Sequence, residues 1–137
     1  SLRYVKIDQG LPSADITIDH ENDWTKTDKK VTITASDAFS GVKNVSVSDS
    51  DGNTVTLTQE SANTYSFVSD NESYHLIVTD YADNKFEMDF TGTKIDKTAP
   101  TITAILGALS TDESTHDIDV TAAVGTSGVQ SFSVYYK

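Results

Sequence analysis

The sequence predicts an all-β protein, because apolar and polar residues alternate along most of the chain and turn-forming residues recur about every ten residues. In addition, no window of ten or more residues has apolar residues at helical spacing. In the segment KKVTITASD, for example, Val31, Ile33 and Ala35 alternate with threonines, as in a strand with one buried face. Strands at this spacing are typical of an antiparallel β-sandwich.

The same alternation predicts about seven strands before residue 97. Turn signals separate them, most clearly at residues 48–54 (SDSDGNT) and 80–84 (DYADN). In chain order the predicted strands cover residues 14–19, 29–37, 42–49, 54–58, 64–68, 74–80 and 85–90.

An internal repeat of about ninety residues divides the chain. Lys6, Ile7, Asp8 and Pro12 recur as Lys94, Ile95, Asp96 and Pro100, and the S-G-V sequence that begins at Ser40 recurs at Ser127. This period suits one compact domain per repeat. We therefore expect the end of a preceding repeat or a linker strand (1–8), a complete module (9–96) and the opening strands of a following module (97–137).

Composition restricts the function classes. The net charge of −11 disfavours binding to nucleic acid or to an anionic lipid surface. No apolar run is long enough for a membrane span, so we expect no membrane insertion. The chain has no cysteine, which excludes disulfides and thiolate metal sites, and its three histidines lie far apart in sequence.

Two segments resemble a known family. In YHLIVTDYADNKFEMDFTGTKIDKTAPTIT a strand ends in an aspartate and leads through a short turn and a last strand to a D-K-T-A-P junction, and SDAFSGVKNVSVSDSDGN contains an S-G-V corner and a D-G-N turn. Together they resemble the bacterial immunoglobulin-like (Big-type) tandem repeat domains of surface or secreted proteins. The matching positions are Asp37, Ser40, Gly41, Val42, Asp51, Gly52, Asn53, Asp80, Ala82, Asn84, Asp96, Thr98, Ala99 and Pro100.

The chain departs from the family pattern at Asp83, where the turn has glycine. Aspartate is among the few residues that tolerate a left-handed backbone, so we expect the turn to be kept.

The resemblance implies an immunoglobulin-like sandwich that acts as a non-catalytic spacer or presentation module, outside the cell, on a bacterial surface or in a secreted multidomain protein. Its partners would be neighbouring modules of the same chain. Some members of the family bind carbohydrate or host protein, which gives the alternative function of a ligand-binding adhesin module. Trp24 and Tyr81 are the candidate contacts, because both lie in polar segments between strands. The competing interpretation is that Trp24 covers one end of the core and that the Tyr74 hydroxyl ties down a loop as a tyrosine corner.

Calcium is a second hypothesis, in which aspartates from the linkers and loops converge at one end of the module. The candidates are Asp37, Asp80, Asp83 and Asp96, together with Asp8. The competing interpretation is that Asp37 and Asp80 cap turns by accepting backbone N–H bonds. Residues 49–53 lack the ligand spacing of a hand-type calcium loop, and a two-residue Asp51-Gly52 hairpin turn is expected there instead.

Catalysis is not expected, and His75 is predicted to face solvent from its strand. Residues 97–137 supply at most three strands, over residues 101–106, 116–124 and 129–137, which cannot close a sandwich. This segment is therefore expected to be disordered, or to pack on the complete module, or to form a strand-swapped dimer.

Overall fold

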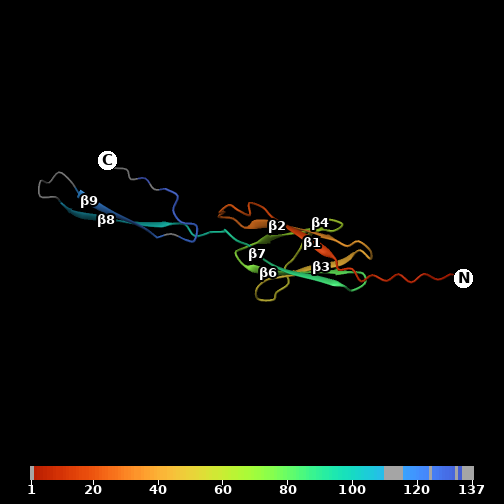
Figure 1. Cartoon of the computed structure of the whole chain (residues 1–137). Coiled ribbons are helices and arrows are strands. Elements are labelled where there is room, and N and C mark those ends of the chain that lie inside the picture. Colours follow the sequence, from red (N-terminus) through yellow and green to blue (C-terminus); the bar gives the residue numbers. More distant parts are fainter. Residues whose placement is uncertain (1, 110–115, 124, 132, 134–137) are drawn as a thin grey trace. The chain divides into compact units, whose positions relative to one another are not determined.

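The structure is a computed structural model that describes residues 2–109, 116–123, 125–131 and 133. These residues are all-β and contain no helix. The described part of the chain therefore has no helix that could span a membrane. The chain forms two compact units, Ser1–Ile95 and Asp96–Lys137 (Figure 1). We predicted the boundary after residue 96, and the division between the two units falls one residue earlier, after Ile95.

Among the described residues of the first unit there are seven strands, which form two antiparallel sheets. One sheet has the order β1-β2-β5-β4 and the other the order β3-β6-β7. The all-β prediction is confirmed. The bounds are β1 Ser13–Ile18, β2 Lys29–Ser36, β3 Val42–Ser48, β4 Thr58–Ser61, β5 Thr64–Ser69, β6 Ser73–Asp80 and β7 Lys85–Thr91.

The strand predicted over residues 54–58 is wrong in its position. Strand β4 starts only at Thr58, and upstream of it the pairing is limited to an isolated bridge between Ser48 and Thr54. Val55 and Leu57 nevertheless pack against the core. Their alternation with threonine therefore reflects partial burial along a segment that crosses from one sheet to the other, without a regular hydrogen-bonded ladder.

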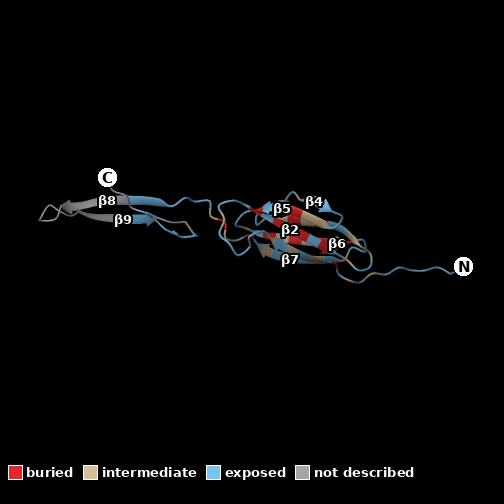
Figure 2. Cartoon of the chain, turned by 90° about the horizontal axis from the view of Figure 1, so that it is seen from above, coloured by how far each residue is buried: buried red, intermediate tan, exposed pale blue. Residues whose placement is uncertain are grey.

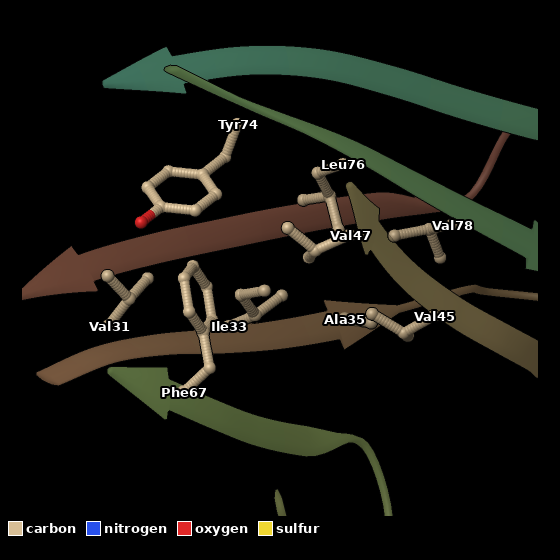
Figure 3. Packing of buried hydrophobic residues seen from close by; sticks show 9 residues of the cluster. All are labelled: Val31, Ile33, Ala35, Val45, Val47, Phe67, Tyr74, Leu76 and Val78. Atoms are coloured by element: carbon tan, nitrogen blue, oxygen red, sulfur yellow. The ribbon is translucent and has the colours of Figure 1, made fainter. Parts of the chain in front are cut away.

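The two sheets face each other across one hydrophobic core. Val31, Ile33, Ala35 and Phe67 come from one sheet, and Val45, Val47, Tyr74, Leu76 and Val78 from the other; all are buried, and Figure 3 shows that their side chains point toward one another. In Figure 2 the buried residues are found mainly in the strands of the first unit, for example in β2 and β6. Burial of each large aliphatic side chain contributes about 1.5–3 kcal/mol, which favours packing of the two sheets through these alternating residues.

The loops that connect the strands of the first unit lie at its two opposite ends. We call the end formed by residues 8–12, 37–41 and 81–84 the entry pole, because the chain enters the sheets there. We call the end formed by residues 19–28, 70–72 and 92–95 the exit pole. Figure 1 shows the amino-terminal segment reaching one end of this unit and the chain leaving from the other.

The second unit contains an antiparallel ribbon of two strands, β8 (Thr101–Leu109) and β9 (His116–Ala123). Two of the three strands predicted after residue 97 are therefore present. The third was predicted over residues 129–137; within it, residues 129–131 and 133 are not in a strand, and residues 132 and 134–137 lie outside the described residues.

Candidate functional site

Three aspartates converge at the entry pole. Asp8 lies in the segment that leads into β1, Asp37 follows β2, and Asp80 ends β6. One carboxylate oxygen from each lies within 4.8 Å of the others, and Asp80 is fully buried. Residues that are far apart in the sequence thus form one acidic cluster.

Asp37 and Asp80 each cap the loop that follows them. Asp37 Oδ2 accepts the N–H groups of Phe39 at 3.1 Å and Gly41 at 2.7 Å. Asp80 Oδ1 accepts the N–H groups of Ala82 and Asn84, both at 2.8 Å. The prediction that these two aspartates act as turn caps is confirmed.

Asp8 joins the incoming segment to the loop between β2 and β3. Its Oδ1 accepts the Gly10 N–H and its Oδ2 accepts the Ser40 N–H, both at 2.9 Å. The Asn84 side-chain amide also donates to the Asp8 carbonyl at 3.2 Å. Hydrogen bonding by Ser40 and by the Gly10 N–H lowers the pKa of the Asp8 carboxyl. The charged form of Asp8 is therefore the one that holds the entry pole together.

The cluster has the oxygen donors that calcium prefers, but most of these oxygens already accept protein N–H groups. Both oxygens of Asp8 and both of Asp80 do so, the second Asp80 oxygen from the Asn84 amide at 2.8 Å, and Asp37 uses one oxygen. These donors offset much of the charge repulsion among the three carboxylates. A metal site at the entry pole stays a prediction.

The other two predicted metal ligands lie outside this cluster of three aspartates. Asp83 Oδ1 is 2.6 Å from Lys43 Nζ on the exposed surface, and this contact lowers the pKa of the Asp83 carboxyl. Asp96 belongs to the second unit, where it contacts Ser127 and Thr98.

The loops that follow β3 and β6 have the same hydrogen-bonded turn. In each, an aspartate Oδ1 accepts the N–H groups two and four residues later, and its Oδ2 accepts the amide of an asparagine; the pairs are Asp49 with Asn53 and Asp80 with Asn84. The residue before each asparagine has a positive φ, 83° at Gly52 and 65° at Asp83. The prediction that Asp83 adopts a left-handed backbone in this turn is confirmed.

The two-residue hairpin turn predicted at Asp51-Gly52 is wrong. That turn type needs a positive φ at both residues, and only Gly52 has one. Instead, Asp49 N–H bonds to Asn53 O at 2.9 Å and Gly52 N–H bonds to Asp49 O at 3.1 Å, which closes a three-residue loop. The Asp49 carboxylate favours this longer loop, because it accepts the N–H group of Asp51 inside the loop and that of Asn53, which closes it.

The two aromatic candidates lie at opposite poles. Trp24 is 48% exposed in the loop between β1 and β2 at the exit pole, and it does not belong to the core. Tyr81 is 67% exposed at the entry pole, where its N–H bonds to Gly41 O at 3.1 Å. A single small ligand cannot contact both.

Tyr81 borders a hollow of about 680 Å³ at the entry pole, which the sequence reasoning missed. Phe39, 81% exposed, lines it beside Ser40 and Ala82, and Val5, Lys6, Ile7 and Asp8 line it from the incoming segment. The signal in the sequence was the phenylalanine within the polar D-A-F-S-G loop.

At the exit pole, Tyr74 has the contacts of a tyrosine corner. Its hydroxyl accepts the Asp70 N–H at 3.0 Å and donates to Glu72 Oε1 at 3.0 Å, while its ring packs against Phe67 and Phe90. Burial raises the pKa of the Tyr74 hydroxyl to about 12. Tyr74 thus stabilises the loop between β5 and β6, as predicted.

His75 faces outward from β6, as predicted. Its Nδ1 lies 2.6 Å from Asp89 Oδ1 and its Nε2 lies 3.7 Å from Glu87 Oε2. This arrangement is a surface charge cluster on the outer face of β6 and β7.

The second unit repeats the Asp8 contacts. Asp96 Oδ1 accepts the Thr98 N–H and Asp96 Oδ2 accepts the Ser127 N–H, both at 2.9 Å. Asp8 makes the same two bonds, to the residue two positions later and to the serine of the S-G-V sequence. The positive φ of Gly41 (88°) also recurs at Gly128 (79°).

These features define an all-β, β-sandwich-like protein whose loops are organised by aspartate turn caps. Comparisons with protein-family models, with curated proteins and with solved structures found no match to this chain.

Proposed function

We propose that this chain is part of a tandem array of immunoglobulin-like domains and that it acts as a non-catalytic spacer or presentation module. The observation that carries the proposal is the repetition of the entry contacts, with Asp8 bonded to Gly10 and Ser40 in the first unit and Asp96 bonded to Thr98 and Ser127 in the second.

The strand order supports the immunoglobulin-like part of the proposal. Constant-type immunoglobulin domains have seven strands with A, B, E and D in one sheet and C, F and G in the other. Lettered in chain order, β1-β2-β5-β4 and β3-β6-β7 give the same arrangement. The position of Tyr74 near the start of β6 also agrees with the tyrosine corner of this fold.

The separation of the entry and exit poles supports the spacer part. The chain enters the first unit beside Ser40 and Asn84, and it leaves beside Thr25 and Asn71 at the other end of the sheets. A domain with its termini at opposite ends adds its own length to a chain of such domains. The bacterial and extracellular setting, on a cell surface or in a secreted protein, rests on the family resemblance, as does the absence of catalysis.

The spacer function is tested with engineered arrays that contain one, two and three copies of residues 9–96 joined end to end, so that Asp96 of one copy precedes the next copy as Asp8 does in the native chain. Small-angle X-ray scattering gives the maximum dimension of each array. We expect this dimension to rise linearly with copy number. The spacer function would be contradicted if the maximum dimension stayed constant, or if it grew only with about the square root of copy number, as in a flexible chain.

The alternative is a ligand-binding adhesin module for carbohydrate or host protein, and the exposure of Trp24 and Tyr81 favours it. Because these residues lie at opposite poles, they define two separate candidate contacts.

Trp24 is the only tryptophan, so its fluorescence reports on the exit pole alone. Titration with glycans or host matrix proteins should change this emission, and Trp24→Ala should weaken binding, if the exit pole is a binding site. Loss of binding in Tyr81→Ala but not in Trp24→Ala would place the ligand at the entry pole.

A further inference from the structure

Two exposed aromatic residues line the hollow at the entry pole of the first unit. Phe39 is 81% exposed and Tyr81 is 67% exposed, and neither belongs to the hydrophobic core. Val5 and Ile7 of the incoming segment line the same hollow and are also exposed. A single exposed apolar side chain needs no explanation, but several that gather around one hollow are typical of an interaction site.

Hydrogen bonds fix the backbone that carries the two aromatic rings. Phe39 N–H donates to Asp37 Oδ2 at 3.1 Å, and Tyr81 N–H donates to Gly41 O at 3.1 Å. Each ring also lies beside a glycine. A Cβ atom at Gly10 would be 3.5 Å from Phe39 Cδ2, and one at Gly41 would be 3.8 Å from Tyr81 Cδ2. A ligand that stacks on these rings therefore has little loop ordering to offset on binding.

Polar groups of different kinds line the hollow beside the rings. Lys6 contributes an exposed ammonium group, which can only donate hydrogen bonds. Asp8 contributes a carboxylate whose two oxygens each accept one backbone N–H, so each oxygen keeps a lone pair for a further donor. The hydroxyl of Tyr81 can both donate and accept. The lining thus combines aromatic surface with donors and acceptors.

We propose that this hollow binds a neutral oligosaccharide, which stacks on Phe39 and Tyr81 and bonds through its hydroxyl groups to Lys6 and Asp8. A sugar ring has CH groups that pack on an aromatic face, and its hydroxyl groups both donate and accept hydrogen bonds. It therefore complements a lining of this mixed kind. The hollow has a volume of about 680 Å³, which lies in the range of about 300–1,000 Å³ that is usual for small-molecule sites.

The charge at the entry pole favours a neutral glycan over an acidic one. Asp37 and Asp80 lie together with Asp8, whereas Lys6 is the one basic residue in the described lining of the hollow. An acidic sugar would approach three carboxylates in a chain with a net charge of −11. A wholly apolar ligand would cover Lys6 and Asp8 without bonding to them, which is unfavourable. The inference rests on the ligand-binding alternative under the proposed function and narrows it to one pole and one ligand class.

Nuclear magnetic resonance titration of the whole nitrogen-labelled chain tests the proposal. The neutral probes are cellotetraose, mannotetraose and chitotetraose, and tetragalacturonate is the acidic probe. We expect a neutral probe to shift the amide signals of Phe39 and Ser40, and to leave that of Trp24 at the exit pole unchanged. Phe39→Ala and Tyr81→Ala should each weaken binding about fivefold or more, because each removes a stacking surface. Trp24→Ala is the matched control, since it removes an exposed ring at the other pole and should leave the affinity unchanged.

The variants also separate loss of the site from loss of the fold. Phe39 and Tyr81 are exposed, so the melting midpoint reported by Trp24 fluorescence should stay close to that of the native chain in both entry-pole variants. Failure of all neutral probes to bind, equal binding of tetragalacturonate, or full affinity in both entry-pole variants would overturn the proposal. If Trp24→Ala abolished binding and the entry-pole variants did not, the ligand-binding alternative would stand at the exit pole and only the site at the entry pole would be rejected.

Discussion

The Tyr74 hydroxyl accepts the backbone N–H of Asp70 at a distance of 3.0 Å, four residues upstream in the loop between β5 and β6. Tyr74 is only 4% exposed, and its ring stacks on Phe90 with the centroids 5.4 Å apart. One side chain thus links the core to a loop of the exit pole, beside the Asn71 side chain that brackets Ile95.

Replacement of this hydroxyl tests its contribution to stability. Tyr74→Phe keeps the ring and removes the oxygen, which leaves the Asp70 N–H without this acceptor. We expect a loss of about 1–2 kcal/mol in the free energy of unfolding, measured by urea denaturation. Tyr65→Phe is the control, because Tyr65 also packs at the edge of the core but has no comparable bond to a loop among the described residues. Equal effects in the two variants would show that the Asp70 contact adds nothing.

The Tyr74 pKa also predicts a pH dependence. Its folded-state value of about 12 lies above the ordinary value of 10.0, so the folded state holds its proton more tightly than the unfolded state. The resulting stability is fully present below pH 10 and is lost as the pH rises toward 12. The stability of Tyr74→Phe should therefore fall less steeply over this range than that of the native chain. Parallel curves for the two proteins would show that Tyr74 does not titrate differently in the folded state.

The turns after β3 and β6 have the same hydrogen-bonding pattern, and they test how burial changes the contribution of this pattern to the free energy of unfolding. Asp49 and Asp80 make the same side-chain bonds, but Asp80 is fully buried and Asp49 is only partly buried. Asp80→Ala would leave buried N–H groups unpaired and should cost about 3 kcal/mol, whereas water can replace the carboxylate in Asp49→Ala, which should cost about 1 kcal/mol. Chemical denaturation of both variants measures the difference. Similar losses would mean that burial of the turn is unimportant.

The strands whose inner faces form the core could be predicted from the sequence, because their buried residues, such as Val31, Ile33 and Ala35, are spaced two residues apart, which is the period of a β-strand. It failed between Ser48 and Thr58, where Val55 and Leu57 are partly buried without a strand ladder. Periodicity reports burial, and it cannot separate a regular strand from an irregular segment that packs on the core.

The arrangement of the three aspartates at the entry pole was predictable only in part. The turn caps Asp37 and Asp80 followed from local sequence, because the N–H groups that they accept lie two and four residues later. The meeting of Asp8 with Ser40 depends on the packing of segments 32 positions apart, which no local pattern encodes. The repeat was the one signal for it, since Asp96 and Ser127 recur with nearly the same separation.

Asp83 provides a test of backbone strain. Its φ of 65° is left-handed, a conformation that glycine adopts without steric cost. Asp83→Gly should therefore keep the fold and change stability by less than about 1 kcal/mol, because relief of strain offsets the lost contact with Lys43 on the exposed surface. Asp83→Val should destabilise by more than about 1 kcal/mol, since a β-branched residue disfavours this conformation. Thermal denaturation of both variants checks the order, and equal stability of the two would contradict the assigned backbone.

The convergence of Asp8, Asp37 and Asp80 leads to a test of the calcium hypothesis. Three carboxylates lie together, and one Asp37 oxygen accepts no N–H bond among the described residues. A cation bound there would stabilise the folded state only, so the melting midpoint reported by Trp24 fluorescence should rise when calcium replaces a chelator.

Asp37→Asn should abolish this rise, whereas Asp83→Asn, a change of equal charge outside the cluster, should retain it. Sodium chloride at matched ionic strength controls for screening of the net charge of −11. If the midpoint does not move, or moves equally in both variants, the three aspartates serve only as turn caps and chain contacts.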